Sequence, residues 1–72
     1  MKYQIEFKID HPVTAITIRH ILFGFGSHQV KGSVESDEVS YLRCDDLADL
    51  RMTLETLARF EVSDVVINTI ED

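Results

Sequence analysis

The 72-residue chain has few of the residues that staple small domains together or carry them across membranes. Cys44 is its only cysteine, so an intramolecular disulfide is excluded, and a lone thiol suits a reducing cytoplasm. The longest apolar run, Ile21 to Phe23, is far shorter than the roughly 20 residues of a membrane-spanning helix. We therefore expect one cytoplasmic domain over residues 1–72, without a membrane partner.

Basic residues are also scarce, and they are unevenly distributed. Residues 1–34 carry four basic and two acidic side chains, whereas residues 35–72 carry three and eleven, so the two halves have charges of +2 and −8. Such a chain repels a phosphate backbone, so we expect no direct nucleic-acid binding. The acidic half is either a solvated face that keeps a small protein soluble or a surface that attracts a basic protein.

Motifs for catalysis and cofactor binding are absent as well. The Gly-Phe-Gly at 24–26 lacks the further glycine and the Lys-Ser/Thr pair of a phosphate loop. The three histidines and the single cysteine lack the spacing of zinc ligands. Helix capping explains the carboxylates Asp45, Asp46 and Asp49 more simply than an acid–base pair does. We therefore expect no catalytic residue, no metal, no cofactor and no enzyme.

The first half of the chain does contain regular hydrophobic patterns. Residues 2–9 alternate between apolar and polar, which predicts a half-buried strand. Pro12 fits the first turn of a helix over residues 13–25, which the following glycines end. A strand is expected over residues 28–35, in which Gly32 marks a bulge or an edge. The helix should turn one apolar face inward: Ala15, Ile18, Ile21, Leu22 and Phe25.

The second half predicts a hairpin, a helix and a last strand. Ser36-Asp37 is a turn before a strand over residues 38–44, and residues 65–70 form the last strand. Asp45 or Asp46 caps the second helix, with Asp49 in its first turn, where a carboxylate suits the helix dipole. The expected inward residues of this helix are Leu47, Leu50, Leu54, Leu57 and Ala58. Its expected outward residues are Ala48, Met52, Glu55, Thr56 and Arg59.

The resulting order β-α-β-β-α-β predicts a ferredoxin-like α+β sandwich, with two helices on one face of a four-stranded antiparallel sheet. RNA-recognition domains of this fold stack bases on aromatic residues of the open face, where only Tyr41 could do so here. In the usual strand order the second and fourth strands are edges. Residues 65–70 could therefore pair with a second copy across a two-fold axis.

The element order and the chain length are similar to those of amino-acid-sensing ACT domains. The segment from Leu57 to Ile67 looks like the helix-to-strand passage of such sandwiches. The likeness is one of architecture: it covers the second half, carries no ligand motif, and lacks the glycine that ACT domains place near the first helix start. It implies, as an alternative function, a small-ligand-sensing regulatory domain with a pocket between residues 10–14 and a neighbouring subunit.

The first helix has more apolar residues than one buried face needs. The side opposite its expected core face carries Val13, Ile16, Thr17, His20 and Phe23. A helix that is apolar all round is usually buried, so this side predicts either a partner surface or a shorter helix with Phe23 turned inward.

We therefore expect a non-enzymatic, acidic protein-interaction module. It would act as a homodimer or with one partner, as an inhibitor or regulator that engages a basic surface. The candidate partner-binding residues lie on the outer first helix and at the start of the second: Ile16, Arg19, His20, Phe23, Asp45, Asp46 and Asp49.

Overall fold

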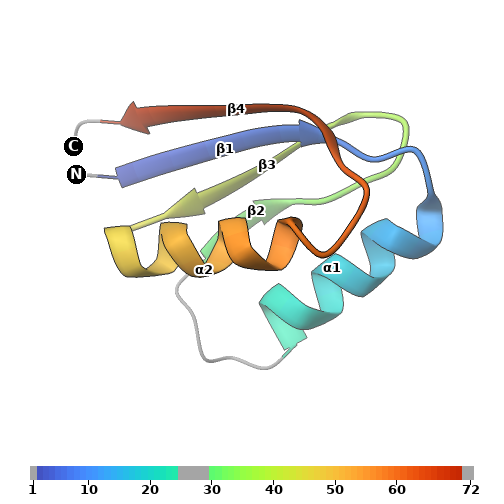
Figure 1. Ribbon diagram of the computed structural model, residues 1–72, viewed down its shortest axis with the longest axis horizontal. Helices are drawn as coiled ribbons and strands as arrows, with labels where there is room; N and C mark the ends of the chain where they lie inside the picture. Colours follow the sequence, from blue (N-terminus) through green and yellow to red (C-terminus); the bar gives the residue numbers. More distant parts are fainter. Residues whose placement is uncertain (1, 25–29, 71–72) are drawn as a thin grey trace.

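The computed structural model describes residues 2–24 and 30–70. It contains six elements (Figure 1): β1 (Lys2–Lys8), α1 (Pro12–Gly24), β2 (Val30–Ser33), β3 (Val39–Cys44), α2 (Leu47–Leu57) and β4 (Ser63–Ile70). The predicted β-α-β-β-α-β order is confirmed, although β2 ends at Ser33 instead of residue 35 and β4 begins at Ser63 instead of residue 65. The expectations for Phe25, Gly26 and residues 28–29 lie outside the described residues.

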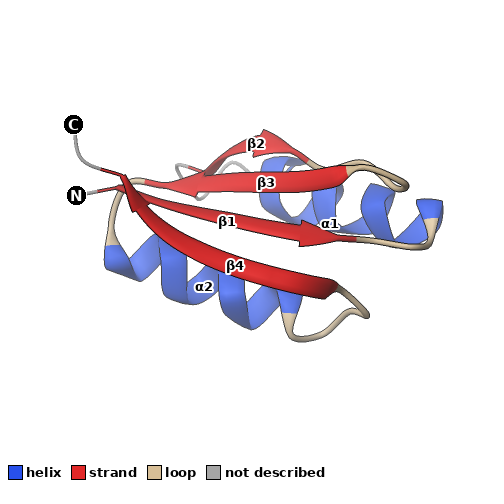
Figure 2. Ribbon diagram, turned by 90° about the horizontal axis from the view of Figure 1, so that it is seen from above, coloured by secondary structure: helices blue, strands red, loops and turns tan. Residues whose placement is uncertain are grey.

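The four strands form one antiparallel sheet in the order β2-β3-β1-β4. Both helices lie on the same face of this sheet, with the opposite face open (Figure 2). This arrangement is that of a ferredoxin-like α+β fold, as predicted. The central strands are β1 and β3, and the edges are β2 and β4, so each edge strand has a backbone neighbour on one side only.

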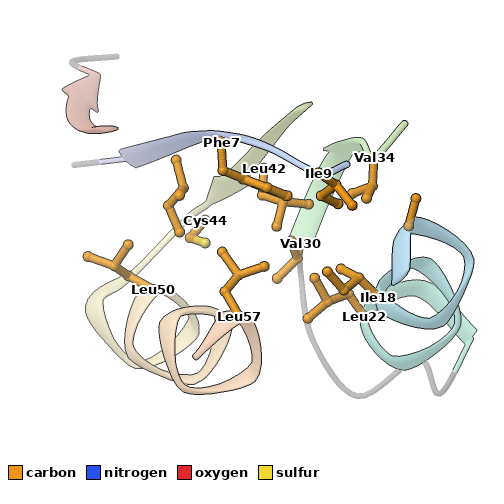
Figure 3. Packing of buried hydrophobic residues seen from close by; sticks show 12 residues of the cluster. Phe7, Ile9, Ile18, Leu22, Val30, Val34, Leu42, Cys44, Leu50 and Leu57 are labelled. Carbon is orange, nitrogen blue, oxygen red and sulfur yellow. The ribbon is translucent and has the colours of Figure 1, made fainter. Parts of the chain in front are cut away.

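The core forms where the alternating strands meet the helices. Side chains of β1 and β3 that point toward the helices are almost fully buried, as the alternation predicts. Figure 3 shows Ile18 and Leu22 of α1 near Val30, and Leu50 and Leu57 of α2 on the side of Cys44. Burying one such aliphatic side chain stabilises the fold by about 1.5–3 kcal/mol, so a few of them carry most of the stability of a small domain.

The second helix is rotated relative to the prediction. Leu47 is 64% exposed and Ala58 is also exposed, although both were expected to point inward. Thr53 and Thr56 are buried instead, which corrects the placement of Thr56 on the outer face. The Thr53 hydroxyl donates to the Asp49 carbonyl oxygen at 2.8 Å, so this polar side chain enters the core with its hydrogen bond made. A hydropathy pattern does not include this hydrogen bond, so it does not predict that Thr53 is buried.

The β2–β3 hairpin is tied closely to its neighbours. The turn contains Asp37 with a φ of 66°, and its backbone N–H donates to the Ile9 carbonyl oxygen at 3.3 Å. Ser40 Oγ accepts from the Glu35 N–H and donates to the Glu35 carbonyl oxygen. Gly32 lies on the edge strand, as expected, with its Cα facing Tyr41. A Cβ at Gly32 would overlap the Tyr41 carbonyl oxygen, so only glycine allows this approach.

The N-cap of α2 gives a direct test of local stability. Asp46 has extended backbone angles, and its Oδ1 accepts from the Asp49 N–H at 2.8 Å. We expect Asp46→Ala to lower the free energy of unfolding by about 0.5–2 kcal/mol, measured by urea denaturation. Asp45→Ala is the matched control. Asp45 is exposed, so this substitution removes the same charge without removing the cap. Equal losses in both variants would contradict the capping role.

Candidate interaction surfaces

The outer side of α1 is exposed along its whole length. Val13 is 74% exposed, Ile16 56% and Phe23 38%, and His20 between them is exposed as well. The helix runs to Gly24, so the shorter helix with Phe23 turned inward is wrong. We call Val13, Ile16, His20 and Phe23 the α1 outer face. Its opposite side buries Ala15, Ile18 and Leu22, so the helix is apolar on two sides and covered on one.

Arg19 lies beside the α1 outer face and is held by an ion pair. Its Nη1 is 3.3 Å from Glu35 Oε1, between α1 and the β2–β3 connection. The two side chains are 41% and 51% exposed, so water screens the pair, and it stabilises the fold by at most about 1 kcal/mol. The ion pair fixes where the guanidinium lies relative to the apolar residues.

The acidic candidates lie elsewhere. Asp45, Asp46 and Asp49 are at the start of α2, at the opposite end of the molecule from α1 (Figure 1). The seven predicted partner-binding residues therefore form two separate surfaces, and a single compact partner site does not include both. Asp46 and Asp49 already serve the helix, one as its cap and the other as the acidic residue of its first turn.

These carboxylates also act on the buried thiol of Cys44. Burial raises the pKa of the Cys44 thiol, and the nearby charges of Asp49, Asp45 and Asp46 raise it further. A contact of 3.5 Å between its Sγ and Thr53 Oγ1 opposes the rise without cancelling it. Cys44 is completely buried, so it is a core residue as the sequence indicates, and its chemistry is that of a protonated thiol.

The open face of the sheet is where the sequence analysis found no signal. Cross-strand register places Glu6 beside Tyr41, and Gln4 beside Arg43, whose Nε donates to Gln4 Oε1 at 3.0 Å. Arg43 also lies over the Tyr41 ring, 5.9 Å from its centroid. This face gathers four of the seven basic residues of the chain: Lys2, Lys8, Lys31 and Arg43. This grouping of basic residues follows from the register of the strands, which the sequence pattern does not give.

The edge strand β4 is uncovered on both of its faces. Val65 is 45% exposed, Val66 50% and Ile67 46%. Ile67 is opposite Ile5 and thus faces the helix layer, whereas Val66 is opposite Glu6 and faces the open side. Three consecutive aliphatic residues of this strand therefore lie at the surface.

A shallow hollow of about 380 Å³ lies where β1 ends. Its lining is Lys8, Ile9, Asp10, Asp37, Glu38 and Val39. The hollow includes Asp10 from the junction for which the sequence predicts a pocket. Its other wall is the β2–β3 turn, and residues 11–14 do not line it. The hydrogen bond from Asp37 N–H to the Ile9 carbonyl oxygen holds the two walls together.

The part of the chain that the structure describes contains neither a group of metal-ligating side chains nor a membrane-spanning helix. Within residues 2–24 and 30–70, no three His, Cys, Asp or Glu side chains are grouped so that they could hold a metal ion. Neither described helix is long and apolar enough to span a membrane.

Comparisons with protein-family models, with curated proteins and with solved structures find no match to this chain. Its function therefore has to be argued from the surfaces themselves.

The raised pKa of Cys44 predicts how stability depends on pH. In the unfolded chain the thiol loses its proton near 9.0, whereas in the folded protein it does so at higher pH. The folded state therefore binds more protons in that interval, and the free energy of unfolding should fall as pH rises above 9.0, by up to about 1.4 kcal/mol per pH unit.

Urea denaturation over a series of alkaline buffers measures this slope. Cys44→Ala is the control, because it keeps every tyrosine and lysine while removing the thiol. An identical slope in the wild type and in Cys44→Ala would contradict the assignment.

Proposed function

We propose that this protein is a small, non-enzymatic, acidic interaction module that binds a protein partner through the α1 outer face. The observation that supports the proposal is the exposure of Val13, Ile16 and Phe23 on a helix whose other side is already buried. An apolar face that a fold leaves in water is stabilised when a partner covers it.

The α1 outer face has the composition of a binding centre. Phe23 is a rigid aromatic residue two helical turns from Ile16, with the polar His20 between them. Covering each of these aliphatic or aromatic side chains contributes about 1.5–3 kcal/mol. The complementary surface on the partner is an apolar groove that accepts one helix face.

Charge selects among partners that offer such a groove. The chain has a net charge of −6, and Asp45, just before the start of α2, is exposed. A basic partner is therefore attracted over a distance, and we propose that the protein regulates or inhibits such a partner in the cytoplasm. The buried, protonated Cys44 suits a reducing compartment.

Substitutions on the α1 outer face test this proposal. We expect Phe23→Asp and Ile16→Asp each to reduce partner capture by at least about tenfold, because a buried, unpaired charge costs more than one factor of ten. Capture is measured by immobilising each variant and quantifying the proteins it retains. Met52→Asp is the matched control, because Met52 is 36% exposed on α2.

The same assay separates the acidic contribution. Asp45→Asn removes one exposed charge and leaves the Asp46 cap intact, so it should weaken binding of a basic partner mainly at low salt.

If the wild type, Phe23→Asp and Met52→Asp all retain the same proteins, that result would contradict the use of the α1 outer face.

A second function is favoured by the hollow at the end of β1. Its lining carries Asp10, Asp37 and Glu38 against the single cation of Lys8, so it favours a ligand with a positively charged amino group. Its volume of about 380 Å³ lies within the range of small-ligand sites. We therefore propose, as the alternative, a ligand-sensing regulatory domain similar in architecture to ACT domains.

A panel of free amino acids tests the alternative by thermal shift. A ligand that binds the hollow should raise the melting temperature by a few degrees at saturation. Asp37→Asn should weaken that shift, since asparagine keeps the left-handed backbone of the turn and removes the charge. A melting temperature that stays constant across the panel would exclude amino acids as ligands of the hollow.

A further inference from the structure

The strand β4 combines three properties that together point to one occupant. It is an edge strand, it is eight residues long, and it exposes aliphatic side chains on both faces. We infer that β4 pairs with β4 of a second copy of this chain, antiparallel across a two-fold axis at Ile67, so that two sheets become one. The inference goes beyond the proposed function, because it uses a surface separate from the α1 outer face.

The backbone of β4 can accept another strand as its neighbour. One side of β4 is bonded to β1, and the N–H and C=O groups of its other side point along the sheet to solvent. Edge strands are commonly guarded by lysine, proline or short length. The regular part of β4, Val65 to Ile70, has none of these guards. The opposite edge has them, because β2 is four residues long and includes Lys31.

A bulge sets one limit of the pairing. The register of β4 on β1 shifts between Glu6 and Lys8, so that three steps along β4 match two along β1. Asp64 lies at this shift with a φ of 55°, and its Oδ2 is 3.7 Å from Lys8 Nζ. The regular ladder therefore begins at Val65, and the only charge of β4 stays outside it with a partner of its own.

Symmetry then restricts the register. A two-fold axis perpendicular to the sheet keeps the two faces distinct. It must therefore pass midway between one residue of β4 and the same residue of the second copy. An axis at Val66 would draw the bulged Asp64 into the ladder. An axis at Asn68 would leave the exposed Val65 outside the pairs that the described residues form. An axis at Ile67 pairs Val65 with Thr69 and Val66 with Asn68 within the regular segment, and it places Asp64 only at the end of the ladder, opposite Ile70.

The side chains match in this register. Ile67 meets its own copy, and because Ile67 is opposite Ile5, a row of four isoleucines crosses the interface on the helix side. Val65 meets Thr69 of the second copy, next to Tyr3 of that copy. No two like charges are opposite each other. The aliphatic residues of β4 that neither helix covers lose water in a single step.

Net charge gives the pairing an unusual salt dependence. Each copy carries a charge of −6, so two copies repel each other at a distance, whereas the ladder itself is uncharged. Screening by salt removes the repulsion and leaves the apolar contacts, so self-association should become tighter as salt rises. Binding of a basic partner should respond in the opposite direction.

The mass in solution, measured by sedimentation equilibrium over a range of concentrations and salt, is the first test. The wild type should be a dimer that strengthens with salt. Ile67→Lys places two cations opposite each other and should raise the dissociation constant by at least about tenfold. Val39→Lys is the matched control, because Val39 is 55% exposed on the central strand β3 and lies outside the interface; it should keep the dimer.

Variants with one added cysteine then test the register. They also test the pairing if Ile67→Lys fails to fold. Ile67→Cys should form an intermolecular disulfide under mild oxidation much faster than Val66→Cys or Asn68→Cys, since only residue 67 meets its own copy. The wild type is the blank, because Cys44 is buried. Faster coupling of Val66→Cys or Asn68→Cys would overturn the axis at Ile67.

The outcomes separate this inference from the proposed function. A wild type that is monomeric at every concentration and salt overturns the β4 pairing and leaves the α1 outer face untouched. A dimer that survives Ile67→Lys and is lost in Phe23→Asp overturns the β4 pairing as well, and assigns self-association to α1. A dimer lost in Ile67→Lys and kept in Phe23→Asp and Val39→Lys supports the inference.

Discussion

The burial of one side of β1 is the constraint on which the rest of the structure depends. Ile5, Phe7 and Ile9 are almost completely buried, and β1 pairs with β3 on one side and β4 on the other. The helices rest against these side chains, so their position is set by a strand that alternates strictly between apolar and polar residues. A shift of one residue in the register of β1 would expose the whole set.

The sequence predicts most of this fold, because its strands and caps are local signals. The alternation of β1 and β3, the turn at Asp37 and the cap at Asp46 all depend on neighbours in the chain. The orientation of α2 does not, because it depends on whether Thr53 finds a hydrogen bond inside the core. Hydropathy treats a hydroxyl as polar whether or not its hydrogen bond is made, so it does not predict the burial of Thr53.

The candidate sites were predictable to the extent that they belong to one element. The apolar surplus of α1 can be read from its sequence, and the structure leaves that side uncovered. The separation of α1 from Asp45 and Asp49 depends on how two helices are placed on a sheet, which composition does not encode. The basic open face and the exposure of β4 likewise depend on register and on the reach of the helices.

The two edges of the sheet differ, and that difference limits growth. The β2 edge is four residues long, and one of them, Gly32, has no side chain to present to a neighbouring strand. A larger residue does not fit there, because its Cβ would overlap the Tyr41 carbonyl oxygen. In the proposed β4 pairing, each molecule contributes one edge of its sheet. That pairing would use both β4 edges and leave a β2 edge at either end of the joined sheet. The short β2 strand would then end the joined sheet and keep an aliphatic edge from seeding a fibre.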